Sequence, residues 1–182
     1  MNQANRSIVL IGMMGAGKSS VGRCLHERTT LALFDTDEIV TSKFGMPISR
    51  IFWKHGENKF RQAETEALRT LATSKPVIIV TGGGIVLRED NLDLLKRLGA
   101  VVWLEADEAT LFNRASRTRN RPLLQCKNPG KVFTKMLRAR LPLYAKIADI
   151  RIDTSELTAE EVAVAIVSKF KKYRHKSAQV TV

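Results

Sequence analysis

The sequence predicts an α/β fold in which five short strands form a parallel sheet and helices connect them. The first observation is that short apolar runs, rich in β-branched residues, alternate with longer segments whose apolar residues recur at helical spacing. The second is that the clearest runs are apolar throughout, as in strands that are covered on both faces. The predicted strands cover residues 7–11, 31–34, 77–80, 100–104 and, most weakly, 149–152.

The predicted elements alternate along the chain. The first strand ends at Gly12 and helical spacing begins at Lys18, while the second strand ends at Asp35 and the third at Thr81. In parallel sheets ligands collect at the carboxyl ends of the strands, so the residues that follow each strand are the candidates for a site. The predicted helices cover residues 18–28, 61–73, 88–98, 108–114, 131–147 and 158–170.

The composition is that of one globular domain, predicted to span residues 1–182. Hydrophobic residues make up 44% of the chain and charged residues 26%, which suffices for a core and argues against disorder. Only Cys24 and Cys126 are present, which excludes a disulfide scaffold. No apolar run approaches the roughly 20 residues of a membrane span, and the N-terminal apolar stretch is too short for a secretory signal. We therefore expect a cytoplasmic protein.

The charge is unusual for a domain of this size. The 30 lysines and arginines exceed the 18 aspartates and glutamates, which gives a net charge of +12. Such a surplus favours polyanionic partners, and it leaves nucleic acid, an acidic membrane surface and a phosphorylated small molecule open as alternatives.

A phosphate-binding loop follows the first predicted strand. The residues from Gly12 to Ser19 match the pattern G-x-x-x-x-G-K-[ST], with a strand before them and a helix after them. In such a loop the backbone N–H groups surround phosphate oxygens, Lys18 reaches the β- and γ-phosphates, and the Ser19 hydroxyl binds Mg²⁺. The alternative is a plain glycine turn before a capped helix, which the strand–loop–helix context disfavours.

Two aspartates follow the second predicted strand. Asp35 and Asp37 are spaced i, i+2, so on an extended strand both carboxylates point to the same side. Beside a magnesium nucleotide, one could hold the metal through water and the other could accept a proton from a substrate hydroxyl. The alternative is a helix N-cap at Asp37, and the preceding phosphate loop favours the functional interpretation.

The third predicted strand ends in Thr81-Gly82-Gly83-Gly84. Glycines permit close approach of the backbone to a ligand, although a flexible turn is the alternative. An aspartate that holds Mg²⁺ is absent at this position, so Asp35 is the candidate metal ligand. The GTPase signature N-K-x-D is also absent, because the matching segment ends in Arg61.

Two further sets of residues contain candidate arginines, a cluster of four and the single residue Arg61. Four of them lie between Arg114 and Arg121, directly before Pro122, which indicates either a lid that closes over phosphates or a solvated basic loop. Arg61 stands three residues before Glu64, a spacing at which a surface ion pair is the simplest interpretation.

Taken together, these motifs resemble the shikimate kinase family. The motifs GMMGAGKS, DTD, GENKFRQAE, TGGG, RPLL and RLPLY occur in this order and span nearly the whole chain. The resemblance implies a three-layer αβα fold of the P-loop kinase type, with a mobile lid at about 114–127 and a substrate-binding region at about 38–60. In that region Phe52 and Trp53 either pack on the substrate ring or fill core.

The resemblance also implies an activity and a set of site residues. With ATP and Mg²⁺ as cofactors, the chain would phosphorylate a shikimate hydroxyl to give shikimate 3-phosphate, in the biosynthesis of chorismate and the aromatic amino acids. The implied ATP-binding residues are Gly15, Ala16, Gly17, Lys18, Ser19, Ser20, Arg114 and Arg121. The implied shikimate-binding residues are Asp37, Arg61, Gly83, Gly84 and Arg140. The implied metal ligands are Ser19 and Asp35, and the implied catalytic residues are Lys18, Asp37 and Arg121.

Two other functions compete with this one. A gluconate kinase would share the phosphate loop and the lid, but it needs no pair of arginines for a carboxylate. A nucleic-acid-binding ATPase would interleave aromatic residues with its basic ones, whereas aromatic residues are only 6% of this chain. We therefore expect a monomer that binds a small substrate and neither nucleic acid nor membrane, with the basic stretch 171–176 in solvent.

Overall fold

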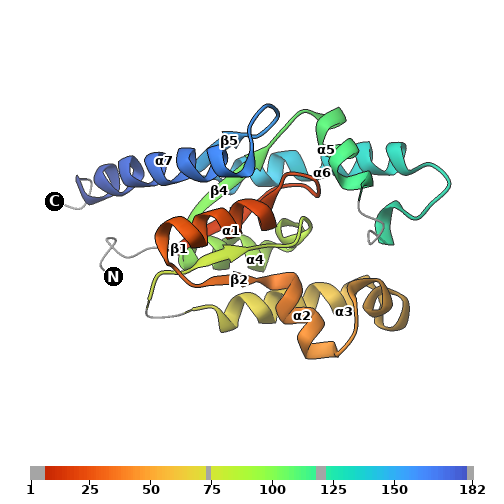
Figure 1. Cartoon of the computed structure of the whole chain (residues 1–182). Coiled ribbons are helices and arrows are strands. Elements are labelled where there is room, and N and C mark those ends of the chain that lie inside the picture. Colours follow the sequence, from red (N-terminus) through yellow and green to blue (C-terminus); the bar gives the residue numbers. More distant parts are fainter. Residues whose placement is uncertain (1–6, 73–74, 118–121, 180–182) are drawn as a thin grey trace.

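All five strands of the central sheet run parallel, in the spatial order β2-β3-β1-β4-β5. The computed structural model describes residues 7–72, 75–117 and 122–179. The strands are β1 (Ser7–Ile11), β2 (Leu33–Asp35), β3 (Ile78–Val80), β4 (Gly99–Glu105) and β5 (Ile150–Asp153). This order places the carboxyl ends of β1, β2 and β3 side by side at one edge of the sheet (Figure 1).

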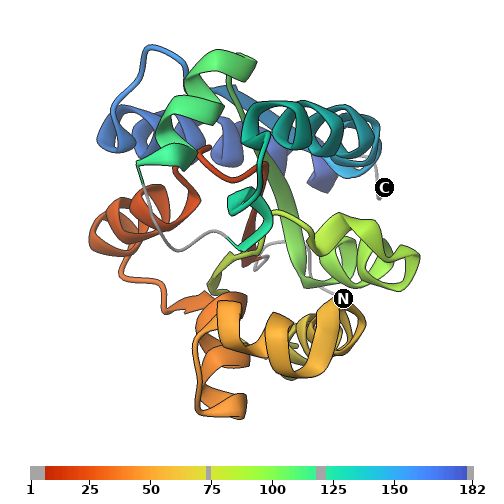
Figure 2. The ribbon, with the colours of Figure 1, turned by 90° about the vertical axis from the view of Figure 1, so that its right-hand side faces the viewer.

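Helices cover both faces of the sheet, which confirms the predicted three-layer αβα arrangement. Helices α1 and α7 pack together on one face, and α4 and α6 lie on the other, while α2 and α3 pack together beyond β2 (Figures 1 and 2). The helices are α1 (Lys18–Thr29), α2 (Thr36–Phe44), α3 (Ile48–Thr70), α4 (Glu89–Leu98), α5 (Glu108–Ser116), α6 (Pro129–Ile147) and α7 (Ala159–Gln179). Short 3₁₀ turns occur at Ile85–Leu87 and Pro122–Leu124.

The strands form the centre of the core because both of their faces are covered. Val9, Leu10 and Val102 have no exposed surface, and α1, α4, α6 and α7 contribute apolar side chains to the same cluster. A second, smaller cluster around Ile51 and Phe60 lies between α2 and α3. The region predicted to bind substrate therefore has apolar packing of its own.

Several helix ends follow from local sequence. Thr158 and Glu161 form a capping box before α7, since the Glu161 carboxylate accepts from the Thr158 N–H at 2.8 Å and the Glu161 N–H donates to the Thr158 hydroxyl at 3.3 Å. Asp107 caps α5 by accepting from the Thr110 N–H at 2.8 Å. These caps fix the loops that lead from β4 and β5 toward the edge of the sheet.

The prediction was wrong in the segment between β2 and residue 61, where no helix was expected. The structure has α2 there, and α3 begins at Ile48. Helix α3 is broken at Gly56, whose φ of 76° and ψ of 166° are not helical, so its first part is too short to show a clear period. In addition, β2 begins at Leu33, two residues later than predicted, and α7 extends to Gln179.

No helix among the described residues is long and apolar enough to cross a membrane.

Candidate active site

The phosphate loop has the strained backbone that its glycines predict. Gly15 has a φ of 88°, and a Cβ at this position would lie 2.2 Å from the Leu111 carbonyl oxygen. Lys18, at the start of α1, is 8% exposed, and its Nζ donates to the carbonyl oxygens of Gly12 at 2.8 Å and Met13 at 3.1 Å. The loop is therefore closed around its own lysine, with the N-terminus of α1 directly behind it.

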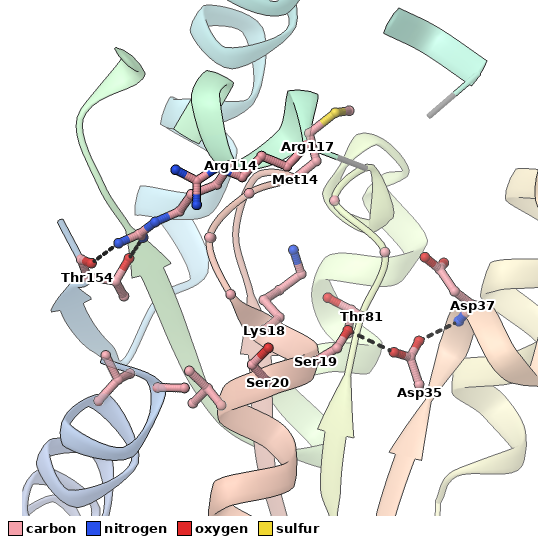
Figure 3. A pocket seen from close by; sticks show the side chains of 18 of the residues that line it. Met14, Lys18, Ser19, Ser20, Asp35, Asp37, Thr81, Arg114, Arg117 and Thr154 are labelled. Atoms are coloured by element: carbon pink, nitrogen blue, oxygen red, sulfur yellow. Dashed lines mark hydrogen bonds between the residues drawn. The ribbon is translucent and has the colours of Figure 1, made fainter. Parts of the chain in front are cut away.

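Asp35 links the phosphate loop to the end of β2 (Figure 3). Its Oδ2 accepts from the Ser19 hydroxyl at 3.3 Å, and its Oδ1 accepts from the Asp37 N–H at 2.9 Å, which caps α2. The prediction that both aspartates lie on an extended strand was wrong, because Asp37 is in the first turn of α2. The alternative, a helix N-cap at Asp37, placed the cap two residues too late, since a helix does begin here and its N-cap is Asp35.

A cleft of about 500 Å³ opens over the phosphate loop (Figure 3). The predicted ATP-binding residues that line it are Gly15, Ala16, Gly17, Lys18, Ser19, Ser20 and Arg114. Asp35, Asp37 and Gly83 line it too. The predicted residue Arg121 lies outside the described residues, so its place relative to this cleft remains a prediction.

Arg114 joins helix α5 to the loop after β5. Its guanidinium donates to the Thr154 hydroxyl at 3.2 Å and to the carbonyl oxygens of Thr154 at 2.9 Å and Ser155 at 3.1 Å. Thr154 and Leu157 line the cleft on that side, in the stretch 153–158 where the family resemblance implies an adenine loop without implying its individual residues. Arg114 thereby shapes the end of the cleft that is remote from Asp37.

A second, smaller cavity of about 80 Å³ lies between α3, α6 and the glycine run after β3. It brings together all five predicted shikimate-binding residues, Asp37, Arg61, Gly83, Gly84 and Arg140. Phe52 lines this cavity, whereas Trp53 is 83% exposed and does not. The two cavities share Asp37, Met14, Gly82 and Gly83, so they adjoin at these residues, of which only Asp37 carries a charge.

Two carboxylates hold Arg61 in a buried position. The surface ion pair that its spacing from Glu64 suggested is therefore not what the structure has. Its Nη1 donates to Glu64 Oε2 at 2.6 Å, and its Nε and Nη2 donate to Glu57 Oε1 at 3.2 and 2.9 Å. Arg61 is 8% exposed and Glu64 is fully buried. Burial lowers the pKa of Arg61, but the attraction of Glu64 and Glu57 outweighs burial and raises the pKa above its ordinary value.

The glycine run permits close approach of Arg61. A Cβ at Gly84 would lie 2.4 Å from the guanidinium of Arg61, which leaves no room for a side chain. The backbone of the run and the Arg61 side chain therefore form one continuous wall of the smaller cavity.

Arg140 reaches the same wall from α6. It is 4% exposed, and its Nη1 lies 3.4 Å from the Gly83 carbonyl oxygen and 3.6 Å from the Met13 sulfur. Tyr144, one helical turn later, donates its hydroxyl to the same Gly83 carbonyl at 2.5 Å. Burial lowers the pKa of Arg140, yet a guanidinium keeps its charge at any ordinary pH, so two buried cations face this cavity.

Sequence analysis did not assign Glu57, Glu64, Gly82 or Tyr144 to the site. A signal was present, because residues three or four positions apart share a helix face. Glu57 and Glu64 stand at this spacing on either side of Arg61, and Tyr144 stands at this spacing after Arg140. The spacing alone does not show that these helix faces are buried.

Comparisons with known proteins agree with this geometry. A family model described as shikimate kinase matches residues 14–171. A shikimate kinase of Thermodesulfovibrio yellowstonii is 44% identical over 92% of this chain and 96% of its own length. One of Thioalkalivibrio sulfidiphilus is 38% identical over 94% of this chain and 90% of its own length.

Solved structures give the same result. A shikimate kinase from Acinetobacter baumannii, in complex with shikimate, has a TM-score of 0.89 and 36% identity, covering 93% of this chain and 95% of that one. A gluconokinase from Sinorhizobium meliloti has a TM-score of 0.69 at 18% identity, a likeness in fold alone, and covers 99% of both chains. The chain belongs to the shikimate kinase family.

Proposed function

We propose that this chain transfers the γ-phosphate of ATP to a hydroxyl of shikimate and produces shikimate 3-phosphate, a step toward chorismate and the aromatic amino acids. The observation that carries this proposal is the meeting of two cavities at Asp37, one over the phosphate loop and one lined by Arg61 and Arg140. A phosphate donor in the first and a carboxylated acceptor in the second would present their reacting groups to each other at this carboxylate.

On the donor side, the proposed roles use the loop and its lysine. The N–H groups of Gly15, Ala16 and Gly17, together with the N-terminus of α1, would bind the phosphates of ATP. Lys18 would exchange its two backbone carbonyl contacts for phosphate oxygens, which attract an ammonium more strongly because they are charged. Arg114 would border the nucleoside end of the cleft, and Ser20 would lie beside the phosphates.

Magnesium fits a pair of oxygen donors at the edge of the cleft. The Ser19 hydroxyl and Asp35 Oδ2 are 3.3 Å apart, and hydroxyl and carboxylate oxygens are the ligands that Mg²⁺ prefers. We propose that these two residues hold it, Asp35 directly or through water. When bound, it would neutralise charge on the phosphates during transfer.

On the acceptor side, the two arginines would hold the carboxylate of shikimate. Glu57 and Glu64 occupy three of the five N–H groups of Arg61, which leaves one on each terminal nitrogen for a bidentate carboxylate. Gly83 and Gly84 would contribute backbone groups. Asp37 would accept a hydrogen bond from the hydroxyl that is phosphorylated and would orient its oxygen toward the donor phosphate.

The lid would supply the remaining positive charge. We propose that Arg121, within the segment 114–127, reaches the transferred phosphate and stabilises the charge that develops on it. Leu123, which lies in the same segment, already lines the acceptor cavity, and this supports an approach of the lid from that side. Closure would exclude water, which otherwise competes as the phosphate acceptor.

A coupled assay of ADP release tests the proposal. We expect turnover with ATP, Mg²⁺ and shikimate, little with gluconate in place of shikimate, and no stimulation by nucleic acid. The Lys18→Ala variant should lose turnover while its circular dichroism spectrum remains that of the wild type. Equal turnover with gluconate, or none with shikimate, would contradict the proposal.

We also propose that a monomer is sufficient for this reaction. The reaction as proposed needs no group from a second copy, because the phosphate loop, Asp37 and both arginines of the acceptor side belong to the same chain. Light scattering during size-exclusion chromatography, combined with the activity of the eluted fractions, tests this: turnover confined to a larger species would contradict it.

A further inference from the structure

Glu64 is a buried carboxyl group to which the proposed reaction gives no task of its own. It has no exposed surface, and its Oε2 accepts from Arg61 Nη1 at 2.6 Å. No hydrogen-bond donor among the described residues contacts its other oxygen, Oε1. An ionised oxygen that is buried without a donor is unfavourable, because it has lost its hydration and gained no hydrogen bond in exchange. This oxygen is therefore the favoured position for a proton.

The Oε1 atom faces a second carboxylate across Gly82. A Cβ at Gly82 would lie 2.5 Å from Glu64 Oε1 and 2.7 Å from Asp37 Oδ1, so both oxygens border the space that the missing side chain leaves. Two carboxylates in one buried site repel each other, and the repulsion favours the protonated form of one of them. A proton on Oε1 would turn an unused acceptor into a donor directed at Asp37, while Oε2 continues to accept from Arg61.

The charges around Glu64 come from three helices. Arg61 and Glu57 are on its own helix α3, Asp37 is on α2, and Arg140 and Tyr144 are on α6. Burial keeps the pKa of Tyr144 above its ordinary value, so this side chain stays neutral. Two cations thus face three carboxyl groups before any substrate is bound.

The ionisation of Glu64 is balanced near neutral pH. Its pKa is raised to about 7, because burial and the negative charge of Asp37 raise it by more than the charge and hydrogen bond of Arg61 and the charge of Arg140 lower it. A fourth carboxylate that binds to the two arginines adds negative charge and draws the guanidinium groups toward itself. Both effects favour the neutral form of Glu64.

We propose that Glu64 takes up one proton from solvent, on Oε1, when the carboxylate of shikimate binds to Arg61 and Arg140. This inference rests on the proposed function. The step is a simple protonation, in which a carboxylate and a solvent proton give a carboxylic acid. Once Glu64 is neutral, its negative charge no longer offsets the positive charges of Arg61 and Arg140, which then attract the substrate carboxylate more strongly. The Asp37 carboxylate stays ionised and can accept a hydrogen bond from the substrate hydroxyl.

Calorimetry of shikimate binding tests the proposal directly. Titrations of the whole protein in buffers whose ionisation enthalpies differ (phosphate, HEPES and Tris at the higher pH, acetate, MES and Bis-Tris at the lower) give the number of protons exchanged with the buffer. At about pH 8 we expect uptake of nearly one proton per shikimate, because free Glu64 is then mostly ionised. At about pH 5.5 we expect almost none, because Glu64 is already protonated. The affinity should fall up to tenfold per pH unit between these limits.

Two glutamine variants locate the proton. Glu64→Gln should bind shikimate without proton uptake, while the matched control Glu57→Gln should retain it, because Glu57 contacts the same arginine but is half-exposed. Uptake that persists in Glu64→Gln would overturn the proposal. If that variant does not bind, the wild type decides alone, since equal or zero proton uptake at both pH values would overturn it too.

Failure of the inference and failure of the proposed function have different signatures. The absence of any binding heat with shikimate at either pH would contradict the proposed function. Binding with a normal heat but no dependence on the buffer would contradict only the proton uptake at Glu64.

Discussion

The hydroxyl of Tyr144 donates a hydrogen bond of 2.5 Å to the carbonyl oxygen of Gly83, across 61 residues of sequence. A planar trans peptide holds the carbonyl of one residue and the N–H of the next on opposite sides. By fixing the Gly83 carbonyl, Tyr144 therefore also fixes the direction of the Gly84 N–H. Since Gly84 lines the smaller cavity, Tyr144 shapes that cavity without lining it.

Removal of this hydroxyl should weaken the binding of the acceptor selectively. In Tyr144→Phe the ring can still pack on Trp103, whose centroid is 5.9 Å away, but the Gly83 carbonyl keeps only the long contact from Arg140. A buried hydrogen bond contributes about 1 kcal/mol, so we expect the KM for shikimate to rise about fivefold with the KM for ATP unchanged.

Tyr173→Phe is the matched control, because it removes the same hydroxyl from α7 and neither cavity contains it. Steady-state kinetics of both variants give the KM values for shikimate and for ATP that test this prediction. A Tyr144→Phe enzyme with equal changes for both substrates would show that the hydroxyl only stabilises the fold.

Arg61→Lys should separate charge from geometry. Lysine keeps the positive charge, but it lacks the fork that contacts Glu57 and Glu64 at once. We expect the KM for shikimate to rise at least about tenfold while the KM for ATP changes little, because one bidentate charge-assisted contact is lost. Arg69→Lys, an exposed change in the last turn of the same helix, should behave as the wild type. If the KM values for both substrates rise equally in Arg61→Lys, the role of Arg61 is structural.

Asp35→Asn should change the magnesium requirement more than the fold. Asparagine caps helices as well as aspartate does, so α2 should keep its N-cap. The neutral amide is a weaker ligand, and we expect the Mg²⁺ concentration for half-maximal activity to rise about tenfold or more. A magnesium titration of turnover, with Asp93→Asn at an exposed position of α4 as the control, measures this. An unchanged requirement would remove Asp35 from the metal site.

The sequence predicted best those parts of the site whose chemistry is local. The phosphate loop, from Gly12 to Ser19, is contiguous, and its glycines are necessary for reasons of backbone geometry alone. Asp37 was predicted as a site residue on the assumption that it lies on an extended strand. It lies on helix α2 instead, and it lines both cavities all the same. The strand order of the sheet places the end of β2 near the phosphate loop, whichever element follows it.

The remaining parts depend on tertiary burial, which periodicity does not contain. Glu64 is at the same spacing from Arg61 as any surface pair, and only the packing of α3 against α2 and the glycine run makes it a buried group. The net charge of +12 is explained only in part. Lys18, Arg61 and Arg140 are buried at the two cavities, whereas Arg28 pairs with Glu160 and Lys43 with Glu66 on the surface.

The buried carboxyl group of Glu64 should also leave a trace in the pH dependence of stability, without any substrate. Its pKa rises from 4.5 to about 7 on folding, so the folded chain binds more protons than the unfolded chain between these values. The stability of the wild type relative to Glu64→Gln should therefore fall by about 2–3 kcal/mol as the pH rises from about 5 to about 8. Urea unfolding at both pH values measures the difference. Glu66→Gln is the control, because its exposed carboxylate pairs with Lys43 and has a lowered pKa, so it stays ionised over this pH range and its relative stability should hardly change. A relative stability that stays constant or rises with pH would show that Glu64 is ionised in the folded protein.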